Sequence, residues 1–195
     1  MILHYLKMAF RNLMKHRLQS VLSIVGLAVG FVCFAYSLIW LRYERTFDSF
    51  HPDADRIYMM YKKNLLGDFQ SVCCPYPFAA TMKEQLPEVE VATAFYPWSV
   101  SYKKDESFGF LEAVSVDTAY LDLFDVRILA GSRSFLHSDR EIALTPTAAR
   151  RLFGTDQVLG RTLDLSSGEE KTVTALVSEW KGHSSIPYES LVGIE

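Results

Sequence analysis

The chain has 195 residues, enough for one or two modest domains, and 49% of them are hydrophobic. It carries 20 Lys and Arg residues against 23 Asp and Glu residues, a formal net charge of −3. This balance gives no reason to expect a nucleic acid partner, because such binding needs a basic surface. The cysteines suggest no disulfide framework, since Cys33 lies in an apolar stretch and Cys73 and Cys74 are adjacent. We interpret them as free or buried thiols.

Residues 1–17 form the first predicted element, an amphipathic helix on the cytoplasmic side. One edge is apolar at helical spacing and comprises Leu3, Leu6, Phe10 and Leu13. Lys7, Arg11 and Lys15 follow one another at steps of four on the opposite face. A basic amphipathic helix of this kind suits the anionic headgroups of membrane lipid. The alternative is that these cations only fix the topology of the next segment.

Residues 18–42 are predicted to cross a membrane. The stretch 21–41 has no charged residue and would span about 31 Å as a helix. Its twelve Leu, Ile, Val and Phe residues favour insertion by about 5 kcal/mol in sum. A signal peptide is the alternative, but the stretch is too long and no small-x-small cleavage site follows it. Four Lys and Arg residues before the helix against three just after it predict a cytoplasmic N-terminus.

A stripe of small residues runs along this helix. It consists of Ser23, Gly26, Gly30, Cys33 and Ser37. Steps of three and four place these residues on one face, where another membrane helix could approach closely. We therefore predict a helix-packing seam. The alternative is a stripe without a role, because Gly is frequent in membrane helices anyway.

The remainder of the chain, residues 43–195, is predicted to be a mixed α/β domain of the α+β class. Predicted strands cover residues 56–62, 89–104, 107–117, 141–145, 162–165 and 171–180. Predicted helices cover residues 77–86, 119–124 and 146–153. The last of these has the clearest boundaries. Thr145 can cap its N-terminus, Pro146 suits the first helical position, and Gly154 stands just past its end.

Residue patterns for catalysis are missing from the sequence. It contains no Gly-Lys dipeptide, so it has no phosphate-binding P-loop, and H-E-x-x-H, C-x-x-C and G-x-S-x-G do not occur. His51, His137 and His183 are scattered, and we interpret each as a surface or turn residue. The acidic pairs 53/55 and 169/170 lie in polar stretches typical of solvated turns. We therefore expect no enzyme activity, catalytic residue, cofactor or metal site on this chain.

Several segments together resemble one transporter family. The basic N-terminal segment, the single apolar helix and FDSFHPDADRIYMM are similar to MacB/FtsX-like permeases of ABC transporters, especially the Bacteroidetes type. VSVDTAYLDLFDVRILAG, EIALTPTAARRLFGTDQVLGRTLDL and SSIPYESLV resemble the family's periplasmic core domain. Leu152, Phe153, Gly154 and Gly160 match its key positions. The resemblance covers nearly the whole chain and implies that the periplasmic domain is truncated at its C-terminal end, before further membrane helices.

The resemblance also implies a function. Such permeases couple ATP hydrolysis by a separate cytoplasmic ABC ATPase to motion of the periplasmic domain, which expels or extracts antibiotics, peptides or lipoproteins. It further implies a multi-pass protein of the bacterial inner membrane that forms a homodimer or a pair with another permease, with a periplasmic adaptor or substrate as a further partner. The alternatives are a single-pass membrane-anchored sensor or interaction domain, and an anchored periplasmic enzyme.

Overall fold

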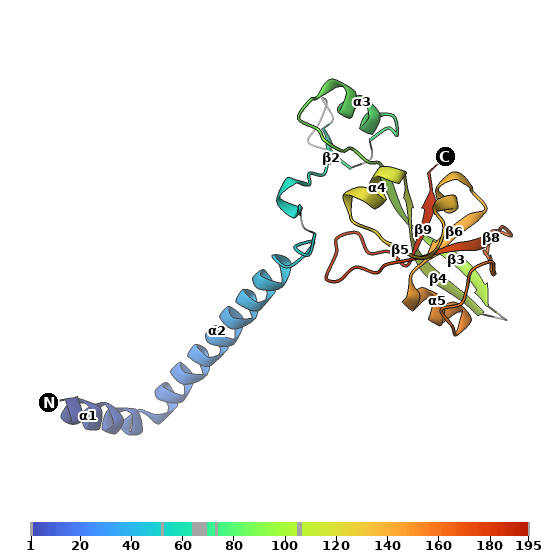
Figure 1. The fold of residues 1–195 in the computed structure, drawn as a ribbon. Coiled ribbons are helices and arrows are strands. Elements are labelled where there is room, and N and C mark those ends of the chain that lie inside the picture. The colour runs from blue at the N-terminus through green and yellow to red at the C-terminus, as the bar shows by residue number, and fades with distance from the viewer. Residues whose placement is uncertain (1, 52, 64–69, 73, 105–106, 195) are drawn as a thin grey trace. The chain divides into compact units, whose positions relative to one another are not determined.

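A computed structural model of the chain describes residues 2–51, 53–63, 70–72, 74–104 and 107–194 (Figure 1). The chain divides into two units, Met1–Phe47 and Asp48–Glu195. Cys73, and Asp105 and Glu106 in the predicted turn after the first long strand, lie outside the described residues.

The first unit consists of two helices, α1 (Ile2–Lys15) and α2 (Arg17–Glu44). The break between them falls at His16, whose carbonyl accepts a hydrogen bond from the Ser20 amide at 2.9 Å. The Ser20 hydroxyl reaches back to the Leu13 carbonyl at 3.2 Å. The 28 residues of α2 extend about 42 Å, and none of them is buried. By length and composition α2 could cross a membrane.

The second unit is built around a seven-stranded mixed sheet. Its strands, in spatial order, are β3 (Phe95–Lys104), β4 (Ser107–Val116), β9 (Ser190–Gly193), β6 (Glu141–Leu144), β8 (Glu170–Val177) and β5 (Ile128–Gly131). A further strand, β7 (Thr162–Asp164), pairs with the beginning of β8. The pairs β4–β9 and β6–β8 are parallel and the others are antiparallel. Two short strands, β1 (Lys62–Lys63) and β2 (Gln70–Ser71), pair separately.

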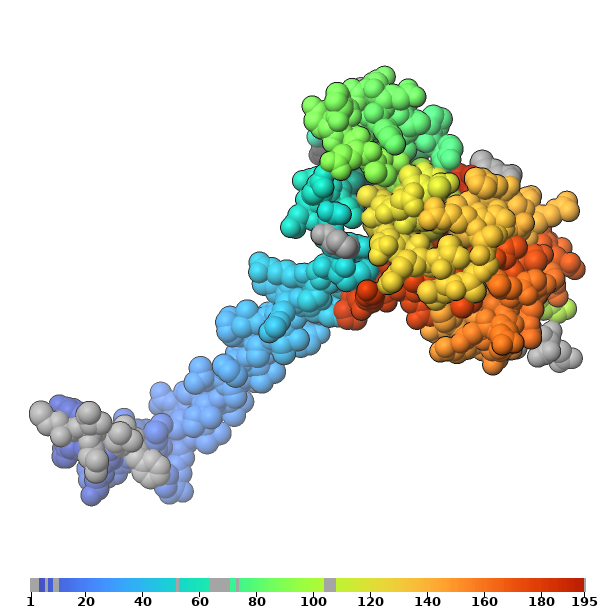
Figure 2. Space-filling view, in the orientation of Figure 1, coloured from blue at the N-terminus to red at the C-terminus, as the bar shows by residue number. Residues whose placement is uncertain are grey.

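Helices and turns pack against both faces of the large sheet: α5 (Pro146–Phe153) contributes to the core on one face, and α4 (Thr118–Leu123) and η2 (Arg133–His137) contribute to the core on the other. Two further elements, η1 (Ala54–Arg56) and α3 (Phe78–Gln85), have no buried residue. In the space-filling view the residues from α4 to β9, coloured yellow to red, form one closely packed body (Figure 2). Alternation along β6 shows how the two faces are filled. Ile142 and Leu144 belong to the core beneath α5, whereas Ala143 belongs to the core beneath α4 and η2.

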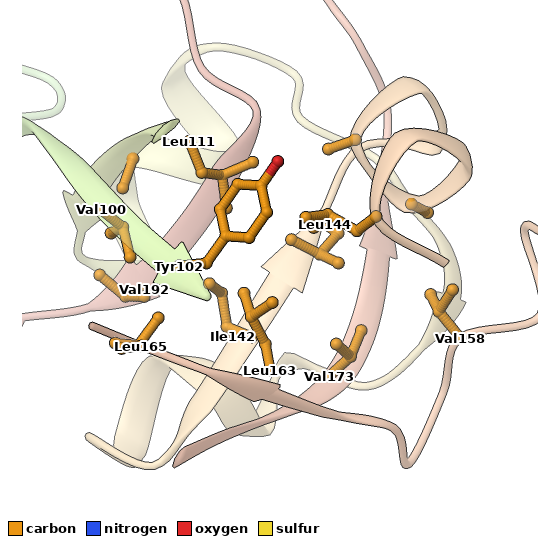
Figure 3. Close-up of a cluster of buried hydrophobic side chains, with 14 of the residues drawn as sticks. Val100, Tyr102, Leu111, Ile142, Leu144, Val158, Leu163, Leu165, Val173 and Val192 are labelled. Atoms are coloured by element: carbon orange, nitrogen blue, oxygen red, sulfur yellow. The ribbon is translucent and has the colours of Figure 1, made fainter. Parts of the chain in front are cut away.

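Both cores are closely packed. In the first, the Tyr102 ring lies among Leu111, Leu144 and Ile142 (Figure 3). The second is centred on fully buried Tyr120 and Phe135. The sheet has a core on each face. This agrees with its two parallel pairs, β4–β9 and β6–β8, because parallel strands occur mostly in sheets that are covered on both faces. The predicted α+β class, with an N-terminal helical segment followed by a mixed domain, is confirmed.

Helix α5 has the predicted boundaries. The Thr145 hydroxyl accepts a hydrogen bond from the Ala148 amide at 3.3 Å, and Pro146 is the first helical residue. Gly154 ends the helix in the left-handed conformation, with φ of 73°, and its amide donates to the Arg150 carbonyl at 2.8 Å.

Three details of the secondary-structure prediction are wrong. The predicted strand 89–104 begins only at Phe95, because residues 89–94 pair with no described strand. The predicted strand 56–62 contains only the first residue of β1, because residues 57–61 pair with no described strand and most of their side chains are exposed. The predicted strand 171–180 ends at Val177, since the Ser178 hydroxyl accepts from the Arg127 amide and the chain then turns away. The prediction also omitted β5, η2 and β9.

Candidate functional site

The described residues form no cluster that could bind a metal ion. Within the described ranges, no group of three or more His, Cys, Asp or Glu residues could hold a metal ion. The candidates for function are therefore the faces of the two N-terminal helices and the contacts at the start of the second unit.

The basic face of α1 is exposed. Lys7, Arg11 and Lys15 all present their side chains to solvent, and Lys15 lies in the last turn, where a cation is favourable to the helix dipole. The side chains of Leu3, Leu6 and Phe10, predicted for the opposite edge, lie outside the described part of the chain. Contact of α1 with a lipid surface stays a prediction.

The small-residue stripe on α2 is open in the structure. A Cβ added at Gly26 or Gly30 would find no described atom within 4 Å outside the helix backbone and chain neighbours. Cys33 is a free, exposed thiol, and the Ser37 hydroxyl donates to the Cys33 carbonyl at 2.9 Å. The hydroxyl of Ser37 is thus satisfied within its own helix, and Ser23 is exposed. The stripe presents a smooth face, and its packing role stays a prediction.

The predicted family-motif positions are structural. Leu152 is only 6% exposed and packs in the first core, while Phe153 is half-buried at its edge, with the Arg161 guanidinium 5.5 Å from its ring centre. Gly160 has φ of 78°, and its amide donates to the Val173 carbonyl at 2.8 Å. Helix α5 thus ends at Gly154, and the connection from α5 to β7 is hydrogen-bonded to β8 through Gly160.

The first four residues of the second unit, 48–51, form a feature that we call the entry turn. Asp48 has φ of 55°, which is uncommon for a residue other than Gly, and its carbonyl accepts from the His51 amide at 3.2 Å. Its amide donates to the His183 carbonyl at 2.8 Å. Its carboxylate oxygen Oδ1 accepts from the Ser184 hydroxyl at 2.8 Å and from the Ser185 amide at 3.0 Å. The turn is thus bonded to the loop between β8 and β9.

An aromatic cluster completes this attachment. The His51 ring is 7% exposed and lies 4.2 Å from the Phe50 ring, 5.0 Å from Trp180 and 5.1 Å from Phe124, measured between ring centres. Gly182 leaves room for Phe50, because a Cβ there would stand 2.9 Å from the Phe50 ring. The imidazole therefore serves as a packed aromatic group: it lies in a turn, one of the two places predicted for it, but it is not at the surface.

The two titratable groups of the entry turn respond to this environment in different ways. Burial lowers the pKa of His51 below its ordinary value of 6.5, although the negative charge of Asp48 acts in the opposite direction. Burial alone would raise the pKa of Asp48, but the hydrogen bonds from Ser185 and Ser184, with a smaller contribution from His51, lower it overall. The favoured state is thus a neutral imidazole beside an ionised carboxylate.

We expect acid to destabilise the domain through His51. The unfolded chain binds a proton near pH 6.5, whereas the folded chain binds it only at lower pH, so stability is lost as pH falls below about 6.5. Asp48 acts in a lower window, below its ordinary value of 3.8. The melting temperature of the chain in detergent should therefore fall from pH 7.5 to 5.5, and His51→Phe should reduce that fall. The exposed His137 provides the control: an equal fall in His51→Phe and His137→Gln would contradict the assignment.

Sequence reasoning did not single out the entry turn as a site. FDSFHPDADRIYMM and SSIPYESLV both entered the family resemblance, but 136 residues separate Asp48 from Ser184. No local periodicity can indicate a contact of that range. The available signal was the presence of two polar, turn-forming motifs in segments that resemble the same family.

The elements described so far define a class: a mixed sheet domain covered on both faces, preceded in the chain by one helix long and apolar enough to cross a membrane. The chain belongs to the MacB-like periplasmic core domain family, whose profile matches residues 20–191. The predicted recognition as a MacB/FtsX-like permease of ABC transporters is thereby confirmed. A comparison with curated proteins gave no significant match.

One solved structure has a similar fold. The chain is similar to a crystal structure of a domain assigned to a permease protein of Porphyromonas gingivalis, with a TM-score of 0.58 and 25% identity over 66% of this chain and 56% of that one. This chain thus spans little more than half of the length of that domain. The periplasmic region of MacB from Actinobacillus actinomycetemcomitans matches with a TM-score of 0.47 and 13% identity, over 76% of this chain and 62% of that one.

Proposed function

We propose that this chain supplies the first membrane helix and the periplasmic core domain of a permease that couples ATP hydrolysis to domain motion. The domain that defines this family is the periplasmic domain of ABC-type transporter permeases. One observation carries the proposal: the family profile begins at residue 20, inside α2, and continues to residue 191. The apolar helix is therefore part of the family unit, which favours a retained anchor over a cleaved signal peptide.

In this proposal the energy for the domain motion comes from a partner protein. The sequence contains no P-loop, so ATP would be hydrolysed by a separate cytoplasmic ABC ATPase. In this proposal residues 1–17 lie on the cytoplasmic membrane surface, residues 18–42 cross the inner membrane, and residues 43–195 contribute to the periplasmic domain. The complete permease would be multi-pass, paired with a second permease subunit, and would act on periplasmic substrates directly or through an adaptor.

The small-residue stripe supports this arrangement, because it offers a face for membrane helices of the complete permease. Close approach of two helices requires small side chains at the contact, and a Leu at position 30 would place a large group in the middle of the stripe. A single-pass anchored sensor or interaction domain would have no such requirement.

Gly30→Leu is the test of this function. The variant should insert into the membrane normally. When the complete permease is affinity-purified, however, several-fold less ATPase should co-purify with the variant than with the wild type. Val32→Ala, a change at an exposed position on the opposite side of the helix from the stripe, is the matched control and should recover the wild-type amount. Failure of the wild-type permease to recover any ABC ATPase would contradict the proposed function, and normal recovery with Gly30→Leu would contradict the seam.

A further inference from the structure

We propose that the entry turn (residues 48–51) is the joint through which movement of the membrane helix reaches the sheet of the periplasmic domain, with Asp48 and His51 as its positioning residues. This inference rests on the proposed function, in which α2 moves during the ATPase cycle. It assigns that movement a route through named contacts of the second unit.

The entry turn holds the loop between β8 and β9 at two points. The Asp48 side chain accepts two hydrogen bonds, from Ser184 and Ser185, and its amide donates to the His183 carbonyl. Hydrogen bonds to an ionised acceptor are stronger than neutral ones. The His51 ring adds a packed contact with Trp180 and Phe124. A displacement of the chain at residue 47 is therefore transferred first to this loop.

The loop in turn is tied to the sheet. Within the loop, the Trp180 indole donates to the Ile186 carbonyl at 2.9 Å and the Tyr188 hydroxyl donates to the Ser178 carbonyl at 2.5 Å, and these bonds hold the loop together. Two backbone bonds of Glu189 join it to the sheet. The Glu189 amide donates to the Glu112 carbonyl of β4 at 2.8 Å, and the Glu189 carbonyl accepts from the Thr145 amide at 2.9 Å. The loop also connects β8 and β9, which both lie inside the sheet rather than at its outer edge strand β3. Movement of the loop thus engages β4, β6, β8 and β9 together.

The alternative route from the membrane helix to the sheet is the chain between the entry turn and β3, and this segment is only weakly attached to the domain. Between the entry turn and β3, none of the described residues of 53–94 is buried, and the segment has only short elements. Its attachments to the rest of the domain include the part-buried Ile57 and the hydrogen bond from Thr93 to Asp117 at 2.5 Å. A fully extended chain of 42 residues would reach roughly 140 Å before pulling on β3. Without the entry turn, movement of α2 would be absorbed in this segment.

Two substitutions isolate the joint. Asp48→Gly removes the carboxylate and keeps a residue that accepts positive φ, so the backbone of the turn is not strained. Asp48→Asn keeps an oxygen acceptor and tolerates the same conformation. Asp125→Gly is the matched control, because Asp125 is the other described residue besides Gly with positive φ, at 49°, and its exposed carboxylate is not the one that accepts from Ser184 and Ser185.

Hydrogen exchange of the chain in detergent micelles tests the joint independently of transport. In Asp48→Gly the amides of residues 183–186 should exchange about tenfold faster or more, while those of β8 stay unchanged. Asp48→Asn and Asp125→Gly should resemble the wild type. Unchanged exchange at residues 183–186 in Asp48→Gly would overturn the inference.

A second measurement follows the movement itself. The complete permease and its ATPase are reconstituted with a donor dye at Ser167→Cys, an exposed turn position, in a background with Cys33, Cys73 and Cys74 changed to Ser, and with acceptor-labelled lipid. ATP should change the energy transfer in the wild type and in Asp48→Asn, while Asp48→Gly should hydrolyse ATP at the wild-type rate with most of that change lost. A purely structural contact would leave the ATP-driven change intact in Asp48→Gly and overturn the inference. A wild type without any ATP-driven change would instead overturn the proposed function and, with it, the route.

Discussion

Replacing Leu152 with alanine is expected to lower the free energy of unfolding of the domain by about 2–5 kcal/mol. Leu152 projects from α5 into the first core, where it is 6% exposed. Removing its side chain loses buried apolar area and leaves a cavity that a sheet packed on both faces can fill only in part. The measurement is thermal and denaturant unfolding of the chain in detergent, followed by tryptophan fluorescence.

Substitutions of two neighbouring residues on α5 serve as comparisons for Leu152→Ala. Arg150 is exposed and pairs with Asp156 at 2.7 Å, so Arg150→Ala should leave the melting temperature close to that of the wild type. Phe153→Ala should fall between the two, because Phe153 only borders the first core. Equal melting temperatures for Leu152→Ala and Arg150→Ala would mean that α5 is rotated relative to the sheet.

Gly131→Ala is the second substitution expected to have a large effect, about 3 kcal/mol or more of lost stability. Gly131 lies at the end of β5 with φ of 87°, and a Cβ there would stand 2.1 Å from the Thr174 carbonyl oxygen of β8. The variant must both adopt a left-handed conformation and push β5 from β8. Equilibrium unfolding by denaturant measures the combined effect.

Gly168→Ala separates the two contributions. Gly168 has nearly the same φ, 86°, but apart from its two chain neighbours no described atom lies within 4 Å of the position of its added Cβ. It should therefore lose only the conformational part, about 1–2 kcal/mol. If Gly168→Ala and Gly131→Ala were equally destabilising, the close approach of β5 to β8 would be contradicted.

Local chemistry explains which parts of the fold could be predicted. The boundaries of α5 follow from a capping hydroxyl at Thr145, a proline at the first helical position and a glycine just past the end. The long strands β3 and β4 have ten residues each, enough for a strand pattern to show in the sequence. By contrast β5 and β9 have four residues each and depend on the strands beside them. Strand β6 is as short, but it runs almost directly into the well-bounded helix α5.

The entry turn could not be predicted, for a different reason. Its residues are individually ordinary for a polar turn, and their partners lie more than a hundred residues further along the chain. His51 in particular was expected at a surface or turn, yet the packing of Trp180 and Phe124 buries it. The apolar run at residues 57–61 led to the opposite error, because exposed Tyr and Met residues there have no partner strand among the described residues.

The claim that α2 holds the domain on the periplasmic side of the inner membrane is tested most directly by topology. Alkaline phosphatase and green fluorescent protein, each fused after residue 60 and expressed in a bacterial host, report opposite compartments. The account predicts active phosphatase, no fluorescence and a fusion whose mass retains the N-terminal helices. Fluorescent fusions with inactive phosphatase would place the domain in the cytoplasm, and a fusion cleaved after α2 would show that the helix is not an anchor; either result would contradict the account.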